Sequence, residues 1–365
     1  MISIERRRGK SWLILNGEET LSKGVNHISY DGDFAPKLGY SPYRRAVESA
    51  YGNVQRWAKS TATRLLAWGF NSVGLWSSKE LWSYIPFFVS LDLAASFGSN
   101  WQTGDVADVF SPDFVDHAES RAEELIQVVK DDPNLMGYFT DNELKWGPDW
   151  RGSQHLLDLF LKKKGAGHDL AVEMSQEYPL EEARELFLKA YAHRYFDVAV
   201  ESIRTRDSRH LVLGVRLAHV IPSIFAVAEA MGSLDAIALN DYGDAAPLET
   251  MRKLHAISGK PIMITEFSFK AMDSGLPNSR GGGRPVRDQA ERALMAKAYL
   301  EAILREPYAV GYHWFQWSDE PKEGRFDGED CNYGLVNIND EPWPELVKMF
   351  SEVNSKAEEL HEGAT

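Results

Sequence analysis

Short apolar runs recur along the chain, and a longer stretch with apolar positions at helical spacing follows most of them. Runs of about four to eight residues between turn signals predict buried strands, and the longer stretches predict amphipathic helices. Because strand and helix alternate throughout, the pattern predicts an α/β fold of the (β/α)8 TIM barrel type. An open doubly wound sheet is the alternative, which is disfavoured because no glycine-rich dinucleotide fingerprint follows the first strand. The eight expected strands cover residues 21–27, 70–76, 87–92, 137–143, 210–216, 234–242, 261–266 and 309–317.

Three stretches lie outside this simple repeat. Residues 1–20 contain Asn16-Gly17, a turn signal typical of a hairpin, and predict a short N-terminal β-hairpin at the bottom of the barrel. Residues 148–180, after the fourth strand, form the longest insertion, and their apolar positions predict an extra helix over the barrel mouth. The glycine run 281–283 is typical of a solvated linker, with a flexible lid as the alternative. We expect residues 1–365 to form one catalytic domain.

Helix signals are clearest at four places. A continuous helical pattern runs from Pro42 to about Trp68, and we expect one long helix there. Ser111-Pro112-Asp113 opens a second helix, and Pro179 followed by two acidic residues opens a third, because proline and acidic residues suit a first helical turn. The last helix should start near Pro344 and run almost to the end of the chain.

Two glutamates stand where predicted strands end. Glu143 closes the fourth strand and Glu266 closes the seventh, and these strands are three apart around a ring of eight. The C-terminal ends of barrel strands carry the catalytic groups of such enzymes. One carboxyl group that protonates the leaving oxygen and another that acts on the anomeric carbon are the minimum for cleaving a glycosidic bond. The pair predicts a glycoside hydrolase, retaining if the carboxyl groups are about 5 to 5.5 Å apart and inverting if the gap is wider.

The surroundings of these glutamates resemble a known group. Asn142-Glu143 on the fourth strand, Glu266 on the seventh and an aromatic on the eighth are similar to the large clan of retaining (β/α)8 glycoside hydrolases. Within it, the chain looks most like exo-acting β-agarases and is β-galactosidase-like. Those agarases usually carry a β-rich domain ahead of the barrel, where this chain has only the hairpin. The resemblance spans nearly the whole barrel and is strongest in residues 137–144, 311–316, 324–329 and 332–336.

The resemblance implies a role for five residues. Glu143 would be the acid/base, with a pKa high enough to carry a proton near neutrality, and Glu266 the ionised nucleophile. Asn142 would bind the 2-hydroxyl of the sugar being cleaved, an interaction that strengthens in the transition state. Tyr242 would hold the nucleophile by a hydrogen bond, and Trp314 would form the floor on which the sugar stacks.

Other aromatic and polar side chains at strand ends are candidate sugar binders. Tryptophan offers a flat apolar face to a pyranose ring, although core packing is the alternative for roughly half of the tryptophans. The ranked substrate-binding candidates are Asn26, His27, Trp76, Asp92, Trp146, His313 and Trp317. Weaker candidates are Trp82, Trp101, Trp150, Arg216, His219, Asp319 and Glu320, and Trp12, Trp57 and Trp68 should be structural. Asp319 and Glu320 have a second interpretation, as supports of the loop that carries Arg325.

Composition narrows the classes of partner. The net charge of −14 argues against nucleic acid, because phosphate binding needs a cationic surface. The single cysteine, Cys331, excludes an internal disulfide. The ten histidines are scattered without a zinc-binding spacing, so we expect no metal and no cofactor, and a metal-dependent hydrolase is the weaker enzymatic alternative. We expect no membrane span, and a cytoplasmic protein unless a leader has been removed from a secreted or periplasmic one.

The sequence therefore predicts a retaining hydrolase that cleaves β-glycosidic bonds by double displacement. Its expected substrate is an oligosaccharide or polysaccharide of the galactan or agarose type, or another β-galactoside. A β-glucosidase or β-mannosidase would differ only in loop residues that read one hydroxyl. A transglycosylase would use the same residues, since an acceptor sugar and water compete for one covalent intermediate. A non-catalytic carbohydrate-binding barrel is the alternative from another class.

Overall fold

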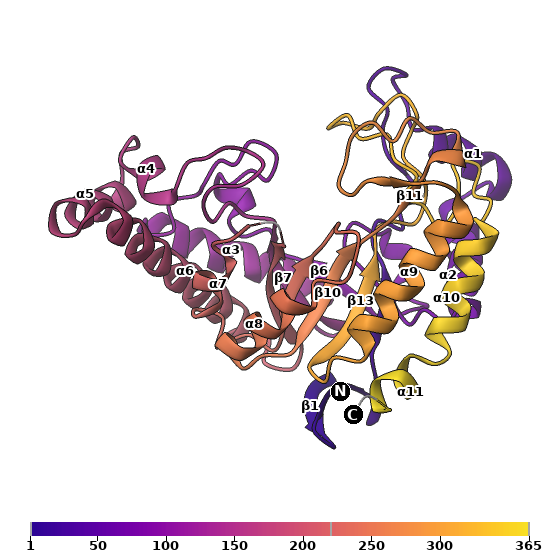
Figure 1. The fold of residues 1–365 in the computed structure, drawn as a ribbon, viewed down its shortest axis with the longest axis horizontal. Coiled ribbons are helices and arrows are strands. Elements are labelled where there is room, and N and C mark those ends of the chain that lie inside the picture. Colours follow the sequence, from indigo (N-terminus) through magenta and orange to yellow (C-terminus); the bar gives the residue numbers. More distant parts are fainter. Residues whose placement is uncertain (1, 220, 364–365) are drawn as a thin grey trace. The chain divides into compact units, whose positions relative to one another are not determined.

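A computed structural model describes residues 2–219 and 221–363 (Figure 1). Within these residues eight parallel strands close into a barrel. Their order around the barrel is β10-β13-β4-β5-β6-β7-β8-β9. The predicted α/β TIM barrel is confirmed, and every strand overlaps its predicted range. The strands are β4 (Ser22–Val25), β5 (Ser72–Val73), β6 (Phe87–Ser90), β7 (Leu135–Asn142), β8 (Leu211–Ala218), β9 (Ile237–Asn240), β10 (Ile262–Phe267) and β13 (Ala309–Trp314).

A buried histidine lies between the first and last strands of the barrel. β13 pairs with β4 in parallel, with His313 opposite Gly24. The Nε2 atom of His313 lies 3.0 Å from the hydroxyl oxygen of Ser22 and 3.3 Å from that of Ser72. A Cβ atom on Gly24 would come within 2.3 Å of the imidazole. Glycine at this position therefore makes room for the histidine.

The N-terminal segment forms a sheet of β1 (Ile2–Arg7), β2 (Lys10–Leu15) and β3 (Glu18–Thr20). The hairpin expected at Asn16-Gly17 is present, since β2 pairs with β3 in antiparallel register. Strand β1 extends this hairpin, and Arg8-Gly9 makes the turn between β1 and β2 with both residues at positive φ. The backbone N–H of Ser11 donates to the carbonyl of Pro307, just before β13, which places this sheet at the N-terminal end of that strand as expected. Residue 1 lies outside the described part of the chain.

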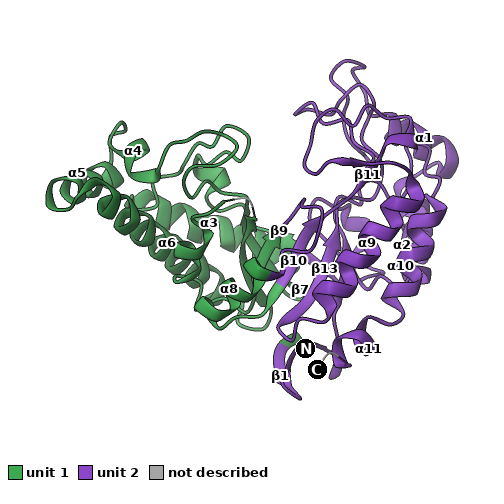
Figure 2. Cartoon of the chain, in the orientation of Figure 1, with its two compact units in different colours: residues 1–3, 89–239, 249–262 green, residues 4–88, 240–248, 263–365 purple. Residues whose placement is uncertain are grey.

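The chain divides into two compact units (Figure 2). The first contains the described residues of 1–3, 89–239 and 249–262. Its long helix α6 runs from Leu180 to Arg204 and contacts the neighbouring helices α3, α4, α5 and α7. The other helices of this unit are α3 (Pro112–Val129), α4 (Leu156–Phe160), α5 (Ala166–Glu177), α7 (Ile224–Ala228) and most of α8 (Leu248–Ser258).

The insertion after β7 contains two helices, α4 and α5, where the sequence predicted one. Both contact α6. Gly165, at φ 136°, sits between them and begins α5 as its N-cap residue. A glycine in this conformation breaks a helical path, which explains the second helix.

The second unit contains the described residues of 4–88, 240–248 and 263–365. The long helix expected from Pro42 to Trp68 is divided into α1 and α2. Gly52 ends α1 in the left-handed conformation, and the side chain of Asn53 accepts a hydrogen bond from the N–H of Arg56 and caps α2. The last predicted helix is likewise two helices, α10 and α11. The bounds in this unit are α1 (Pro42–Tyr51), α2 (Val54–Ala67), α9 (Gln289–Leu304), α10 (Pro344–Asn354) and α11 (Ala357–Glu362).

Two short strands and three 3-10 turns lie among these elements in the described residues. β11 (Lys270–Ala271) and β12 (Pro285–Val286) pair in parallel before α9. The 3-10 turns are η1 (Lys79–Leu81), η2 (Ala95–Phe97) and η3 (Met272–Ser274). In the described ranges no helix combines the length and the apolar character that crossing a membrane requires.

Candidate active site

Four successive barrel strands are each followed by a non-glycine residue in the left-handed conformation. They are His27 after β4, Trp76 after β5, Asp92 after β6 and Glu143 after β7, at φ 50°, 59°, 52° and 47°. This conformation is uncommon for residues with a side chain and costs free energy, and such residues concentrate at functional sites. All four are candidates that the sequence placed at the barrel mouth. His27 and Trp76 lie in the second unit, and Asp92 and Glu143 lie in the first, so each unit carries candidate site residues shortly after its barrel strands.

In the first unit, the backbone of Glu143 is held on both sides. Its N–H donates to the carbonyl of Arg216 at 3.0 Å, and its carbonyl accepts a 2.7 Å hydrogen bond from the guanidinium of Arg151. The side chains of Glu143 and Asn142 are partly exposed. The strained backbone is thus fixed by neighbours in its own unit, while the two polar side chains reach the surface.

Asp141 ties the end of β7 to the loop after β6. Its buried carboxylate accepts hydrogen bonds from the N–H groups of Ala94 and Ala95 and from the hydroxyl of Tyr195. Burial raises the pKa of Asp141 to about 7, although these hydrogen bonds act in the opposite direction. Asp141, next to Asn142, therefore holds the end of β7 against the loop after β6, and its charge changes near pH 7.

We expect Asp141→Asn to change how stability depends on pH. The folded state keeps a proton on Asp141 between the ordinary pKa of 3.8 and about 7, so its stabilising contribution is complete below pH 3.8 and is lost as the pH rises through 7. Because asparagine does not ionise, the variant should lack this pH-dependent loss of stability, whose slope in the native protein is at most about 1.4 kcal/mol per pH unit. The free energy of unfolding in urea, measured at about pH 5 and pH 8, tests this. An equal difference between native protein and variant at both pH values would contradict the prediction.

In the second unit, Tyr242 and Glu266 form the contact that the sequence motif implied. The hydroxyl of Tyr242, which follows β9, donates to Oε2 of Glu266 at 2.7 Å. The carbonyl of Glu266 accepts from the N–H of Asp241, whose carboxylate accepts from the hydroxyl of Tyr299. Glu266 is 5% exposed. Its carboxylate is thus oriented by a neutral donor that follows the adjacent strand, β9.

An aromatic cluster adjoins this glutamate. Phe315, directly after β13, meets Trp76, Tyr242 and Tyr333 edge-on, with ring centroids 6.3, 6.2 and 5.9 Å apart. Trp76 remains 44% exposed. Its open face and its place after β5 keep it as a candidate for stacking on a sugar. Phe315 was not among the predicted site residues, whereas the adjacent Trp314 was.

That residue, Trp314, does not form a floor for a sugar. It is fully buried and packs against Phe267 and Phe350, and its indole N–H donates to the carbonyl of Tyr333. Side chains alternate along a strand, so when His313 faces the barrel interior, Trp314 faces the surrounding layer of helices. The stacking role expected for Trp314 was wrong.

Two further tryptophans are core residues. Trp146 is buried among Tyr191, Tyr195 and Phe196. Trp317 is fully buried, lies on Trp68, and its N–H donates to a tyrosine hydroxyl on α1. Both were expected to bind substrate, and both fill gaps between the barrel and its helices instead.

Of the polar candidates after β4 and on β13, two are structural and one remains at the surface. Asn26 is fully buried; its amide donates to the carbonyl of Thr265 and its oxygen accepts from the N–H of Leu75. His313 is the interior residue described above. His27 is partly exposed, and its Nδ1 lies 2.8 Å from the side-chain oxygen of Gln316. Burial removes the first two as substrate ligands and leaves the third.

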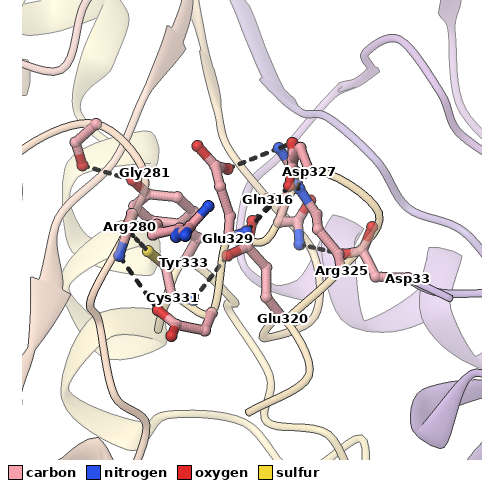
Figure 3. Close-up of polar contacts among 12 residues, drawn as sticks. Asp33, Arg280, Gly281, Gln316, Glu320, Arg325, Asp327, Glu329, Cys331 and Tyr333 are labelled. Carbon is pink, nitrogen blue, oxygen red and sulfur yellow. Dashed lines mark hydrogen bonds and ion pairs between the residues drawn. The ribbon is translucent and has the colours of Figure 1, made fainter. Parts of the chain in front are cut away.

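A buried arginine gathers carboxylates from the loop after β13 (Figure 3). Arg325 donates to Asp327 and to Glu329, and it forms an ion pair with Glu320 at 3.3 Å. The predicted support of the Arg325 loop by Glu320 is confirmed. Asp319 serves a neighbouring segment, where it accepts from Asn332 and the N–H of Gly334.

Glu329 is the member of this cluster whose pKa responds to the nucleophile candidate. Burial raises the pKa of Glu329, Arg325 opposes the rise, and the negative charge of Glu266 adds to it. The side chain of Glu329 is 22% exposed. Glu329 belongs to the run 324–329 that carries part of the family resemblance, but its buried contacts form only in the folded chain.

The glycine run 281–283 packs closely on two tyrosines. The hydroxyl of Tyr333 donates to the carbonyl of Gly282, and Lys270 donates to the carbonyls of Arg280 and Gly281. A Cβ atom on Gly282 would lie 2.7 Å from the ring of Tyr242. The glycines therefore allow the loop to approach Tyr242, the residue that donates to Glu266.

The described residues contain no group of three or more histidine, cysteine, aspartate or glutamate side chains placed to hold a metal ion. No protein-family model matches the chain. The chain is 27% identical to β-agarase B of Vibrio sp. (strain JT0107) over 420 residues, which cover 97% of this chain and 42% of that protein. It is 26% identical to β-agarase A of the same strain over 385 residues, covering 89% of this chain and 38% of that protein.

The chain thus spans less than half the length of these curated relatives. The solved structure of an agarase, AgWH50C, superposes with a TM-score of 0.84 and 26% identity over 99% of this chain and 64% of that one. The resemblance to barrel glycoside hydrolases of the β-agarase type that the motifs indicated is therefore confirmed along nearly the whole chain.

Proposed function

We propose that this barrel is a glycoside hydrolase that cleaves β-glycosidic bonds in galactan or agarose-type oligosaccharides by double displacement. The observation that carries the proposal is the placement of Glu143 at the end of β7 and Glu266 at the end of β10, three strands apart in the closed barrel, in a chain similar to β-agarases throughout. Each glutamate has a backbone or side chain anchored within its own unit. The pair supplies the two carboxyl groups that the reaction needs.

In this mechanism Glu143 protonates the glycosidic oxygen while Glu266 attacks the anomeric carbon, which gives a covalent glycosyl-enzyme and releases the leaving sugar. Glu143 then removes a proton from water, which attacks the same carbon and releases Glu266. Tyr242 holds the attacking oxygen by its 2.7 Å hydrogen bond. Asn142, partly exposed beside Glu143, binds the 2-hydroxyl, and His27 and Trp76 are further sugar contacts.

We expect Tyr242→Phe to lower kcat/KM by about 10- to 100-fold, because a hydrogen bond to a charged group is worth about 1.5 to 3 kcal/mol. Without this donor the carboxylate is less firmly oriented towards the anomeric carbon, so most of the loss should appear in kcat rather than in KM. Tyr51→Phe is the matched control, since its hydroxyl also donates to a carboxylate, that of Asp340, in the same unit. A native kcat in Tyr242→Phe, with any loss confined to KM, would contradict the assigned role.

Hydrolysis of agarose-derived oligosaccharides and of a panel of aryl β-glycosides by the native protein tests the proposed function. Cleavage of the galactosides with release of the sugar in the β configuration at first is the expected result. Preference for glucosides or mannosides would correct the sugar, and transfer to an added acceptor would show transglycosylation. Binding without cleavage of any substrate would favour the non-catalytic barrel.

A further inference from the structure

Trp150 is an exposed tryptophan whose ring rests on a buried arginine. Trp150 is 51% exposed and lies in a tight turn closed by two hydrogen bonds between the main chains of Asp149 and Gly152, each 3.1 Å long. The guanidinium carbon of Arg151 lies over the indole, 4.3 Å from the ring centroid. One face of the ring is therefore covered by a cation, in a cation–π contact, while much of the side chain stays open to solvent.

The arginine beneath this ring is itself immobilised. Its side chain is 1% exposed and its Nε and Nη2 atoms donate to one oxygen of Asp149, at 3.0 and 2.6 Å. Nη1 donates to the carbonyls of Trp101 and Glu143, at 2.8 and 2.7 Å. Lys145 donates to the other oxygen of Asp149. Because four of its five N–H donors are occupied, the guanidinium presents a fixed flat support to Trp150.

Arg151 thus contacts both the ring of Trp150 and the main chain of Glu143, the acid/base candidate. All of these residues belong to the first unit, so these contacts do not involve the second unit. Gly104, at φ 74°, packs against the same arginine, and a Cβ atom there would lie 3.3 Å from the Cβ of Arg151. A scattered surface tryptophan needs no such foundation, whereas a platform for a ligand does.

We propose that Trp150 is a sugar-binding subsite that stacks on an uncharged pyranose in the leaving-group part of the substrate, and that Arg151 positions it relative to the backbone of Glu143. The proposal rests on the proposed function, in which Glu143 protonates the leaving oxygen. A sugar held beside Glu143's own loop then belongs to the leaving side. The apolar face of a galactose-type ring matches the open indole, and no charged group of the ligand is needed.

Two substrates separate this role from a general effect on the enzyme. An agarose-derived hexasaccharide has sugars on the leaving side, whereas β-galactosyl fluoride loses only a fluoride ion and has none. Trp150→Ala should lower kcat/KM for the hexasaccharide by about tenfold, with most of the change in KM, and leave the fluoride within about twofold of the native value. Trp150→Phe should restore most of the loss. Val128→Ala, at an 80% exposed site of α3, is the control and should change neither.

Equal losses on both substrates, or native activity of Trp150→Ala on the hexasaccharide, would overturn the subsite. A binding measurement keeps the test independent of catalysis. If the native protein cleaves neither substrate, the hydrolase proposal fails, and calorimetric titration with the hexasaccharide then tests the subsite alone. An affinity that falls about tenfold in Trp150→Ala supports the subsite. An affinity that is unchanged in the variant, or absent in the native protein, overturns it. Thermal melting of each variant reports whether it is folded.

Discussion

Replacing Glu266 by alanine is expected to lower kcat on galactan-type substrates by a factor on the order of 10^4 to 10^6, because no covalent intermediate can form without the nucleophile. The fold should tolerate the change, because it removes a buried negative charge and the hydroxyl of Tyr242 that donates to this carboxylate is neutral. The measurement is the steady-state rate on an oligosaccharide and on an aryl β-galactoside.

Glu143→Ala should behave differently with different leaving groups. Loss of a general acid costs about 10² to 10⁴ in rate when the leaving oxygen needs a proton. An activated aryl galactoside or a galactosyl fluoride needs little protonation, so its first step should be nearly native. Glu352→Ala, at an exposed position of α10, controls for loss of one negative charge and should keep native rates on every substrate. Equal losses of Glu143→Ala on activated and unactivated substrates would contradict the acid/base role.

The second large effect is on stability. Arg325→Met should lower the free energy of unfolding by about 3 to 5 kcal/mol, because it leaves Glu320, Asp327 and Glu329 without their buried cation. Arg287→Met is the matched control. That arginine is 78% exposed and pairs with Asp288, and removal of an exposed pair costs about 0 to 1 kcal/mol.

The loss in Arg325→Met should grow with pH. Burial raises the pKa values of Glu320 and Glu329 in the native fold, and Arg325 opposes the rise, so its removal raises them further. A carboxyl whose folded pKa is raised stabilises the fold at low pH and loses that contribution as the pH rises through the folded pKa. Urea unfolding should therefore show a smaller difference from the native protein at about pH 5 than at about pH 8. A difference that does not change with pH would show that the carboxylates are solvated or otherwise paired.

The barrel and the positions of its polar strand ends were predictable from local patterns. Apolar runs that end in Glu143, Glu266 or Asp92 require only that strands be recognised and that their C-terminal ends carry polar groups. The contact of Tyr242 with Glu266 followed from the family resemblance of the residues rather than from spacing. Errors were small where only an element boundary was at stake, as at Gly52, where one glycine divides a helix.

Residues whose role depends on the direction of a side chain were harder to assign. Trp314 and Phe315 are adjacent aromatics, and only the strand's alternation, fixed by His313 in the barrel interior, decides which one faces the helices. Arg151 was not selected, because its partners are brought together only by folding. Charged residues in polar loops are usually solvated, so their sequence carries no signal of the buried networks that they form.

The most direct test of the central claim is azide rescue of Glu143→Ala and Glu266→Ala on an activated aryl β-galactoside, with the anomeric configuration of each product read by NMR. If Glu266 is the nucleophile and Glu143 the acid/base, Glu143→Ala should give the β-galactosyl azide, because azide attacks the covalent intermediate, and Glu266→Ala should give the α-galactosyl azide, because azide attacks the substrate from the opposite face. The same anomer from both variants, or native activity in either one without azide, would contradict the assignment.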